Sequence, residues 1–330
     1  MALPRSRSYL GIAKETRPAA GAAPTAVAAT DFIPYTSITP ADNIQYLDDK
    51  GMRGSMVDLY GIVQGNIHSE FEFGGDVFAD TIGYPLAGVL GDVTFTAGTP
   101  NTHAISTLNS QTTNGQPTTY TLSDYYGLGA ATTRQFAGVQ FQSVDLKFTA
   151  DALLTYSAKA LGYQSVTAAN PTPSFSTLTP VPAWVGAVTL NAASSILVAE
   201  GNCTIERTVT PIWTVDNNQR PYQLFAGAVT AGGSLNLVFE TDTQLLLFLN
   251  NTQPNLVVDF SQGAGATLTQ VKLNMTKAAI TVGAIKRDKD YVELSLTYKA
   301  IANTTDGGTS AGYSPIKVTL QNTKATGTYA

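Results

Sequence analysis

The chain has 330 residues, of which 43% are hydrophobic and only 13% are charged, about half the charged share of an average soluble protein. The net charge of −5 excludes the basic surface with which proteins grip nucleic acid. No apolar run approaches the ~20 residues of a membrane-spanning helix, residues 1–15 lack the apolar core of a secretory signal, and the single Cys203 excludes an internal disulfide framework.

The N-terminal residues 1–30 are rich in Ala, Pro and Gly and lack clear periodicity, which predicts a flexible arm. The alternative is an arm that becomes ordered only on a neighbouring subunit. Strand-like sequence follows. Its clearest segment has Phe71 and Phe73 on one face and Glu70 and Glu72 on the other, the alternation of a half-buried strand.

A short helix is predicted next, over residues 76–91. Apolar residues recur there with helical spacing, and Gly91 can end the helix. Residues 92–120 are rich in Thr, Asn, Gly and Pro, which predicts a long polar loop or hairpin. In the strand after it, the alternation breaks near residues 143–144, which indicates a β-bulge.

The midpoint of the chain carries four prolines within residues 168–183, which predicts a linker on the surface. Residues 184–330 then repeat the order of events of residues 31–167: strands, an apolar strand, a short helix (241–252, with an apolar stripe of Leu245, Leu246 and Leu249) and closing strands. We therefore predict an all-β fold with minor α content, made of two fused β-sandwich modules, each with a short flanking helix.

The sequence contains few of the residues on which catalytic sites usually depend. The chain has two histidines, His68 and His103, and both are predicted to lie on the surface, away from any nucleophile. Cys203 is predicted to be a small buried hydrophobic residue. Glu70 and Glu72 could act as a pair of carboxylates, but a solvated strand face is the simpler interpretation. We expect no enzyme activity, metal or cofactor.

An ordered series of segments resembles the tail tube (major tail) proteins of long-tailed, siphovirus-type bacteriophages, especially phages of actinobacteria. The series runs from about residue 29 to 306. Its main segments are TDFIPYTSITPADNIQYLDDKGMRGSMVDLYGIVQG (30–65), SEFEFGGDVFADTIGYPLAGVLGDV (69–93), FAGVQFQSVDLKF (136–148), TPIWTVDNNQRPYQLFAG (210–227) and KDYVELSLTYKAIANTTD (289–306).

This resemblance implies a structural subunit that assembles into stacked rings, forming a hollow tube through which double-stranded DNA passes. It implies no catalytic residues and no cofactor. The duplicated pattern favours a trimeric ring with pseudo-sixfold symmetry, with a hexamer as the alternative. Expected partners are further copies of the chain and the tape measure, tail terminator and tail tip proteins, without a membrane. The expected location is the virion, after synthesis in the host cytoplasm.

The bore of such a tube must let DNA slide, so we expect an acidic or neutral polar wall. Asp58, Glu70 and Glu72 are the candidate residues facing this lumen. The alternative function is a β-sandwich binding module, such as an adhesin or a receptor- or carbohydrate-binding phage protein. It would need an exposed aromatic platform, and the candidates Trp184 and Trp213 are both predicted to lie in the core.

Overall fold

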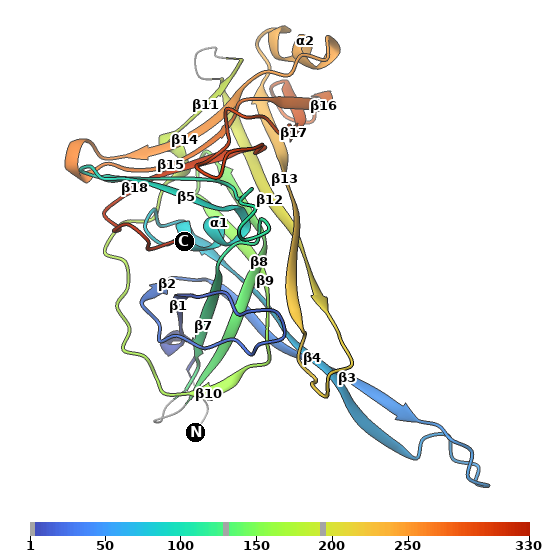
Figure 1. Ribbon diagram of the computed structural model, residues 1–330. Coiled ribbons are helices and arrows are strands. Elements are labelled where there is room, and N and C mark those ends of the chain that lie inside the picture. The colour runs from blue at the N-terminus through green and yellow to red at the C-terminus, as the bar shows by residue number, and fades with distance from the viewer. Residues whose placement is uncertain (1–3, 128–131, 192–195) are drawn as a thin grey trace.

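The computed structural model describes residues 4–127, 132–191 and 196–330. These residues form mainly strands, with two α-helices and three short 3₁₀ helices. The prediction of an all-β fold with minor α content is therefore confirmed (Figure 1). The helices are α1 (Gly83–Leu90), α2 (Thr243–Leu249), η1 (Arg5–Arg7), η2 (Ala183–Val185) and η3 (Gly265–Thr267).

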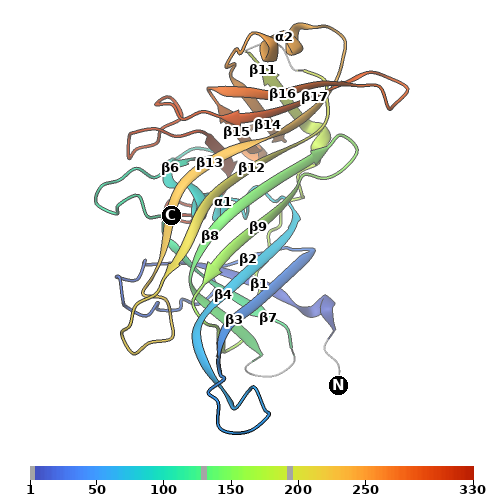
Figure 2. The same ribbon diagram turned by 90° about the vertical axis from the view of Figure 1, so that its right-hand side faces the viewer.

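The larger sheet has twelve strands. They are β1 (Tyr9–Glu15), β2 (Asp31–Ile33), β3 (Ser37–Asp49), β4 (Gly61–Asp76), β7 (Thr119–Tyr125), β8 (Thr133–Thr149), β9 (Thr155–Gly162), β10 (Val166–Ala168), β12 (Val198–Ile212), β13 (Gln223–Val238), β16 (Ala278–Lys286) and β17 (Glu293–Ala300). Eight of them form an antiparallel run in the order β3-β4-β9-β8-β12-β13-β17-β16. Figure 2 shows most of this run face-on.

The second sheet has six strands in the order β11-β14-β15-β18-β6-β5. They are β5 (Gly91–Thr96), β6 (Asn101–Thr107), β11 (Gly186–Leu190), β14 (Leu256–Gln262), β15 (Thr269–Met275) and β18 (Lys317–Asn322). Both sheets thus combine strands from the two halves of the chain. A hydrophobic cluster of buried residues, which includes Phe73, Leu146, Leu235 and Leu273, runs without a break across both halves.

The helix α1 lies at the centre of this core, and all eight of its residues are buried. Its sequence GYPLAGVL carries no charged group, so it can be enclosed without the cost of burying one. Gly91 ends it with a left-handed backbone (φ 96°), a conformation that glycine adopts without strain. The predicted end of the helix is therefore confirmed, whereas the helix begins seven residues later than predicted (at 83 instead of 76) and no side chain caps it.

The N-terminal segment differs from the flexible arm that we expected. Residues 9–15 form β1, which pairs with β2 on one side and β7 on the other. Leu10 and Ile12 are fully buried and join the core cluster. The run of buried residues in β1 is short, and the Ala- and Pro-rich stretch that follows made it hard to recognise from the sequence. Burial of their side chains accounts for the order of this segment.

Three other segments refine the predictions. Residues 92–120 hold most of the β5–β6 hairpin, a loop and the start of β7, so the hairpin alternative of that prediction is found together with a shorter loop. Residues 169–182, in the proline-rich segment, contain no regular strand. The predicted bulge near residue 143 is confirmed by a register shift between Phe141 and Ser143.

Candidate assembly surface

The eight-stranded run contains the same four-stranded arrangement twice. In the first half of the run, the hairpin β3–β4 is followed across the sheet by β9 and then β8. In the second half, the hairpin β12–β13 is followed by β17 and then β16. The run therefore reads as two copies of one unit placed side by side. The internal junction between them is the antiparallel pairing of β8 with β12.

A shared irregularity in the two hairpins fixes the alignment of the copies. The pairing of β3 with β4 shifts register between Ile44 and Tyr46. The pairing of β12 with β13 shifts in the same way between Arg207 and Val209, which makes Arg207 the counterpart of Ile44. The hairpins also end at matching pairs, Asp49–Gly61 and Ile212–Gln223. Bulges set local register and twist, so their coincidence identifies equivalent residues.

A second shared bulge gives the alignment of the other two strands. The pairing of β8 with β9 shifts register between Phe141 and Ser143. The pairing of β16 with β17 shifts between Ile280 and Val282, which makes these two residues the counterparts of Phe141 and Ser143. All four strands of one copy thus have assigned counterparts in the other. In this sheet, the repeated pattern of strand pairing therefore extends to single residues.

The two outer strands of the run have unpaired edges. Among the described residues, β3 pairs only with β4, and β16 pairs only with β17. Each edge therefore presents a row of backbone N–H and C=O groups that can pair with another strand. The strands alternate in direction along the run, so β16 and β3 are suited to antiparallel pairing with each other in different copies of the chain.

The two α-helices lie at corresponding places but differ in what covers them. The helix α1 packs on β8 and reaches β12, and Nη1 of Arg207 in β12 donates to the Val89 carbonyl oxygen at 3.1 Å. The helix α2 packs on β16, the counterpart of β8. Counted from the helix starts, Leu246 and Leu249 correspond to the buried Leu86 and Val89. They are 47% and 63% exposed.

This exposure corrects the prediction for α2, which is also shorter than the predicted span of 241–252. We expected Leu245, Leu246 and Leu249 to form a single apolar stripe on the helix. Leu245 does pack against the core, together with Phe248, but Leu246 and Leu249 lie on the open side of the helix. The residues do recur with helical spacing, but within the described part of the chain they do not share one buried face.

The face of the eight-stranded run turned away from the core is polar. Glu70 and Glu72 both lie on it, as their alternation with the buried Phe71 and Phe73 predicted. Glu72 forms an ion pair with Lys159 of β9 at 3.6 Å, and Glu70 lies 3.5 Å from the His68 imidazole nitrogen. We call the polar face of β4, β9, β8, β12, β13 and β17 the open face.

Asp58 lies apart from these two carboxylates. It belongs to the loop between β3 and β4, with its side chain 88% exposed and Lys50 4.0 Å away. The structure therefore brings Glu70 and Glu72 onto one strand face and leaves Asp58 outside it.

Other charged residues of the open face were missed by the sequence analysis. Asp145 in β8 pairs with Lys147 at 3.2 Å and accepts a hydrogen bond from the Thr204 hydroxyl at 2.7 Å across the β8–β12 junction. Glu200 and Glu206 in β12 are exposed as well. Their alternation with buried residues such as Cys203 and Ile205 was the signal that could have found them. The open face has a small excess of carboxylates over lysines.

The β3–β4 hairpin projects well beyond the body of the molecule (Figure 1). Large apolar side chains are exposed along its outer part: Tyr46, Leu47, Met52, Met56, Val57, Leu59, Ile62 and Val63. The tip of the β12–β13 hairpin also exposes Val215. Exposed apolar surface concentrated on one projection is typical of a protein contact site.

The two histidines and the cysteine, which were considered for catalysis, lie in separate surroundings. His103 is buried in β6, against the rings of Phe95 and Tyr329, so its prediction as a surface residue was wrong. His68 is partly exposed on the open face, as predicted. Cys203 is fully buried, as predicted, and burial raises the pKa of its thiol to about 12. Among the described residues, no group of three or more His, Cys, Asp or Glu side chains could hold a metal.

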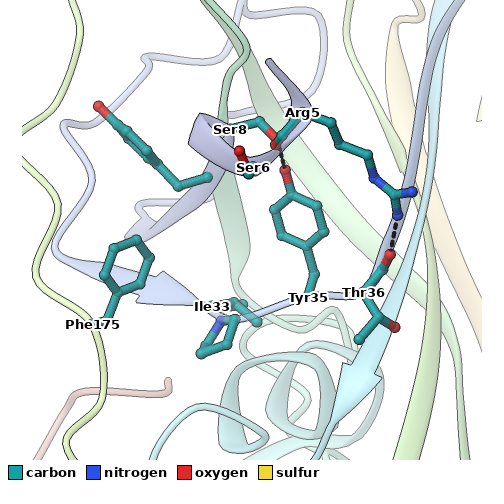
Figure 3. Close-up of a pocket in the computed structure, with 9 residues that line it drawn as sticks. Arg5, Ser6, Ser8, Ile33, Tyr35, Thr36 and Phe175 are labelled. Carbon is teal, nitrogen blue, oxygen red and sulfur yellow. Dashed lines mark hydrogen bonds between the residues drawn. The ribbon is translucent and has the colours of Figure 1, made fainter.

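A cavity of 660 Å³ lies beside β2, between η1 and Phe175 (Figure 3). The Arg5 guanidinium donates to the Thr36 carbonyl oxygen at 2.5 Å, and the Tyr35 hydroxyl donates to Oγ of Ser8 at 2.7 Å. Its nine lining residues include no carboxylate, histidine or cysteine. The cavity therefore has neither a nucleophile with a base nor a metal ligand set.

Both tryptophans were expected in the core, and this expectation was wrong. Trp184 lies in η2 and is 74% exposed. Trp213 follows β12, is partly exposed, and its indole lies 6.0 Å from the His68 ring. The strand that the sequence suggested begins only at Gly186, two residues after Trp184. Trp184 thus lies in a 3₁₀ helix, and Trp213 lies in the loop between β12 and β13.

Comparison with known proteins identifies a family. The family model described as "Phage tail tube protein" matches residues 5–300. No curated protein matches the chain. No helix among the described residues is long and apolar enough to span a membrane.

Proposed function

Because the chain belongs to the phage tail tube protein family, we propose that its copies join edge to edge into rings, and that the rings stack into the tube through which double-stranded DNA leaves the virion. The observation that carries this proposal is the duplicated four-stranded unit with an unpaired strand at each end. A sheet with two free, complementary edges satisfies its backbone groups by closing with other copies into a barrel.

A ring of three chains is the stoichiometry that we favour. Eight strands from each of three copies would close a barrel of about 24 strands, wider than the 16–18 strands that already leave an aqueous channel in porins. The two copies of the unit within each chain would give this trimer pseudo-sixfold symmetry. A hexamer of whole chains, the alternative, would double the number of strands.

We propose that the open face lines the bore. The other face of the eight-stranded run packs against the second sheet and α1. This bulky layer needs the larger circumference, so it belongs on the outside of a closed barrel. Glu70 and Glu72 would then face the DNA as part of a polar, weakly acidic wall that offers little counterion release to hold the duplex.

Stacking of rings is assigned to the projecting β3–β4 hairpin. Its exposed apolar side chains would be buried against the next ring, a head-to-tail contact that repeats without closing and so builds a filament. At the ends of the tube the same surfaces would meet the tail terminator, tail tip and tape measure proteins. The proposed setting is a long-tailed phage of an actinobacterium, with synthesis in the host cytoplasm.

The second candidate function is a binding module that reads carbohydrate or a receptor. The exposed indole of Trp184 is the observation in its favour, because aromatic faces stack on sugar rings. A platform usually needs more than one such ring, and Trp213 lies in a different part of the chain, the loop between β12 and β13.

Electron microscopy of the purified full chain tests the proposal. Rings or hollow tubes with a central bore support the tail tube function. Dispersed monomers at high concentration that retain affinity for immobilised glycans would contradict it and favour the binding module.

A further inference from the structure

We propose that β16 of one copy pairs with β3 of the next copy in a single register, with Ala284 opposite Ala41, and that this contact also covers the exposed leucines of α2. The inference rests on the proposed function, since it identifies the partner of each free edge as a second copy of the chain. It adds the residues that meet, which neither the family nor the sequence specifies.

The register follows from the internal junction. In the pairing of β8 with β12, Asp145 lies opposite Thr204. Counted from the shared bulges, Ala284 is the counterpart of Asp145, and Ala41 is the counterpart of Thr204. If the second unit meets the first unit of the next copy as the two units meet within the chain, Ala284 therefore faces Ala41.

The side chains at the two edges suit this register. Both alanines are exposed in the single chain and would lie on the same side of the sheet as the open face. On the core side, Ile285 is the counterpart of Leu146, and Pro40 is the counterpart of Cys203, which lies opposite Leu146. Pro40 has no N–H to donate, so the new ladder would lack one hydrogen bond there, as an edge strand tolerates.

The helices support the same contact independently of the strands. Inside the chain, α1 spans the β8–β12 junction and is fully buried. The helix α2 lies on β16, and its Leu246 and Leu249 point away from any strand of their own chain that could cover them as β12 covers α1. A neighbouring β3 would supply that cover.

A difference between the two units makes the proposed contact between chains more apolar than the internal junction. Arg207, which donates to the Val89 carbonyl oxygen on α1, has Ile44 as its counterpart in β3. Val89 has Leu249 as its counterpart in α2. The charged hydrogen bond of the internal junction would thus be replaced by contact of Ile44 with Leu249, which buries apolar surface.

Disulfide crosslinking tests the register. Within one chain, Ala41 and Ala284 lie seven strand spacings of ~4.8 Å apart along the sheet, far beyond the reach of a disulfide. In the variant Ala41→Cys with Ala284→Cys, every crosslink must therefore join two chains. Mild oxidation of assembled tubes is expected to give a ladder on non-reducing gels, ending at the number of chains in one ring.

The matched control is Ala41→Cys with Ala279→Cys. Ala279 lies on the same face of β16, because the bulge between Ile280 and Val282 makes five residues span four positions of β17, about 14 Å along the strand. We expect at least tenfold more crosslinked chain for the Ala41–Ala284 pair than for this control. Equal crosslinking of the two pairs, or none for either in preparations that show normal tubes, would refute the register while leaving the tube function intact. Absence of rings from the unmodified chain would instead refute the proposed function.

A second variant tests the cover of α2 without relying on cysteine chemistry. Leu249→Asp places a charge on a side chain that is already exposed in the single chain, so the fold should survive. Rings and tubes are expected to decrease at least tenfold at equal concentration. Asn250→Asp adds the same charge one residue away without removing apolar surface, and it should assemble normally. Normal assembly of Leu249→Asp would contradict the proposed contact.

Discussion

Gly233 in β13 lies opposite Tyr298 in β17, and a β-carbon on Gly233 would come within 2.8 Å of the Tyr298 hydroxyl oxygen. That hydroxyl donates to the Asn202 carbonyl oxygen of β12 at 2.9 Å. At the corresponding pair of the first unit, Phe71 lies opposite Ala160. Each unit thus has one aromatic ring at this pair. In the first unit the ring belongs to Phe71 of β4, and in the second it belongs to Tyr298 of β17.

We predict that Gly233→Ala destabilises the fold. A β-carbon there would lie 2.0 Å from the Asn202 carbonyl oxygen, a backbone atom, so the strands must move apart. Overpacking of this kind costs about 1–3 kcal/mol. The measurement is urea unfolding, with a lower midpoint and an unchanged slope. Gly227→Ala in the same strand is the control, because its β-carbon would meet neighbours only at 3.4 Å or more. Equal stability of the two variants would refute the packing argument.

A second prediction concerns pH. Burial raises the pKa of Asp124 to about 6 from its usual 3.8. The folded chain therefore holds this proton more tightly than the unfolded chain, and the carboxylate weakens the fold increasingly as the pH rises from about 4 to 6. Asp124→Asn is expected to increase the free energy of unfolding by about 1–3 kcal/mol at pH 7 and to change it little below pH 4. A variant with no gain at pH 7 would contradict this account.

Asp42 should respond with the opposite sign. Burial acts to raise the pKa of Asp42, but hydrogen bonds from Ser165, Ser69 and Arg134 together lower it. The carboxylate then stabilises the fold above pH ~4, and this contribution is lost as the pH falls through the lowered pKa. Asp42→Asn is expected to lower the stability at pH 7 and to cost less in acid. A constant difference across the pH range would argue against it.

The lumen assignment predicts an effect on DNA release. Glu70→Lys combined with Glu72→Lys should leave tube formation intact, because both side chains are exposed in the single chain. Phages carrying the double variant should release DNA more slowly, and added salt should restore the rate, since contacts with phosphate weaken with salt. Asp58→Lys in the hairpin loop is the control. Release at the normal rate from the double variant would show that this face does not line the bore.

Ring stacking can be separated from ring closure. Met52→Asp combined with Met56→Asp replaces two apolar side chains that are completely exposed near the tip of the β3–β4 hairpin. We expect rings of normal mass but few tubes, as seen by electron microscopy and sedimentation. Ser55→Asp adds charge to the same loop without removing apolar surface and should form tubes. Long tubes from the double variant would rule out the hairpin as the stacking contact.

The sequence predicts the local structure better than the arrangement of strands. Alternation placed Glu70 and Glu72 on the polar face because each strand has one buried side, and Gly91 ended the first helix as expected. The two halves of the chain share few identical residues. Paired exchanges, such as Phe71 with Ala160 in one unit and Gly233 with Tyr298 in the other, change both residues while one aromatic ring still fills the site. Shared backbone bulges, which the sequence marks only weakly, reveal the alignment.

The errors have a common cause in tertiary packing. Residues 9–15 are ordered by the strands on either side of them, and His103 is enclosed by the rings of Phe95 and Tyr329. Most of these neighbours, such as β7 and Tyr329, come from distant parts of the chain, so a local sequence pattern does not reveal them. Leu246 and Leu249 show the reverse case, because their apolar pattern suggests burial and both side chains are exposed in the single chain.

The mass of one ring, measured by native mass spectrometry of rings dissociated from tubes, tests the central claim most directly. Two four-stranded units per chain predict three chains of 34.7 kDa in each ring, about 104 kDa in total. A ring of six chains, or a species that never exceeds the mass of one chain, would contradict the account.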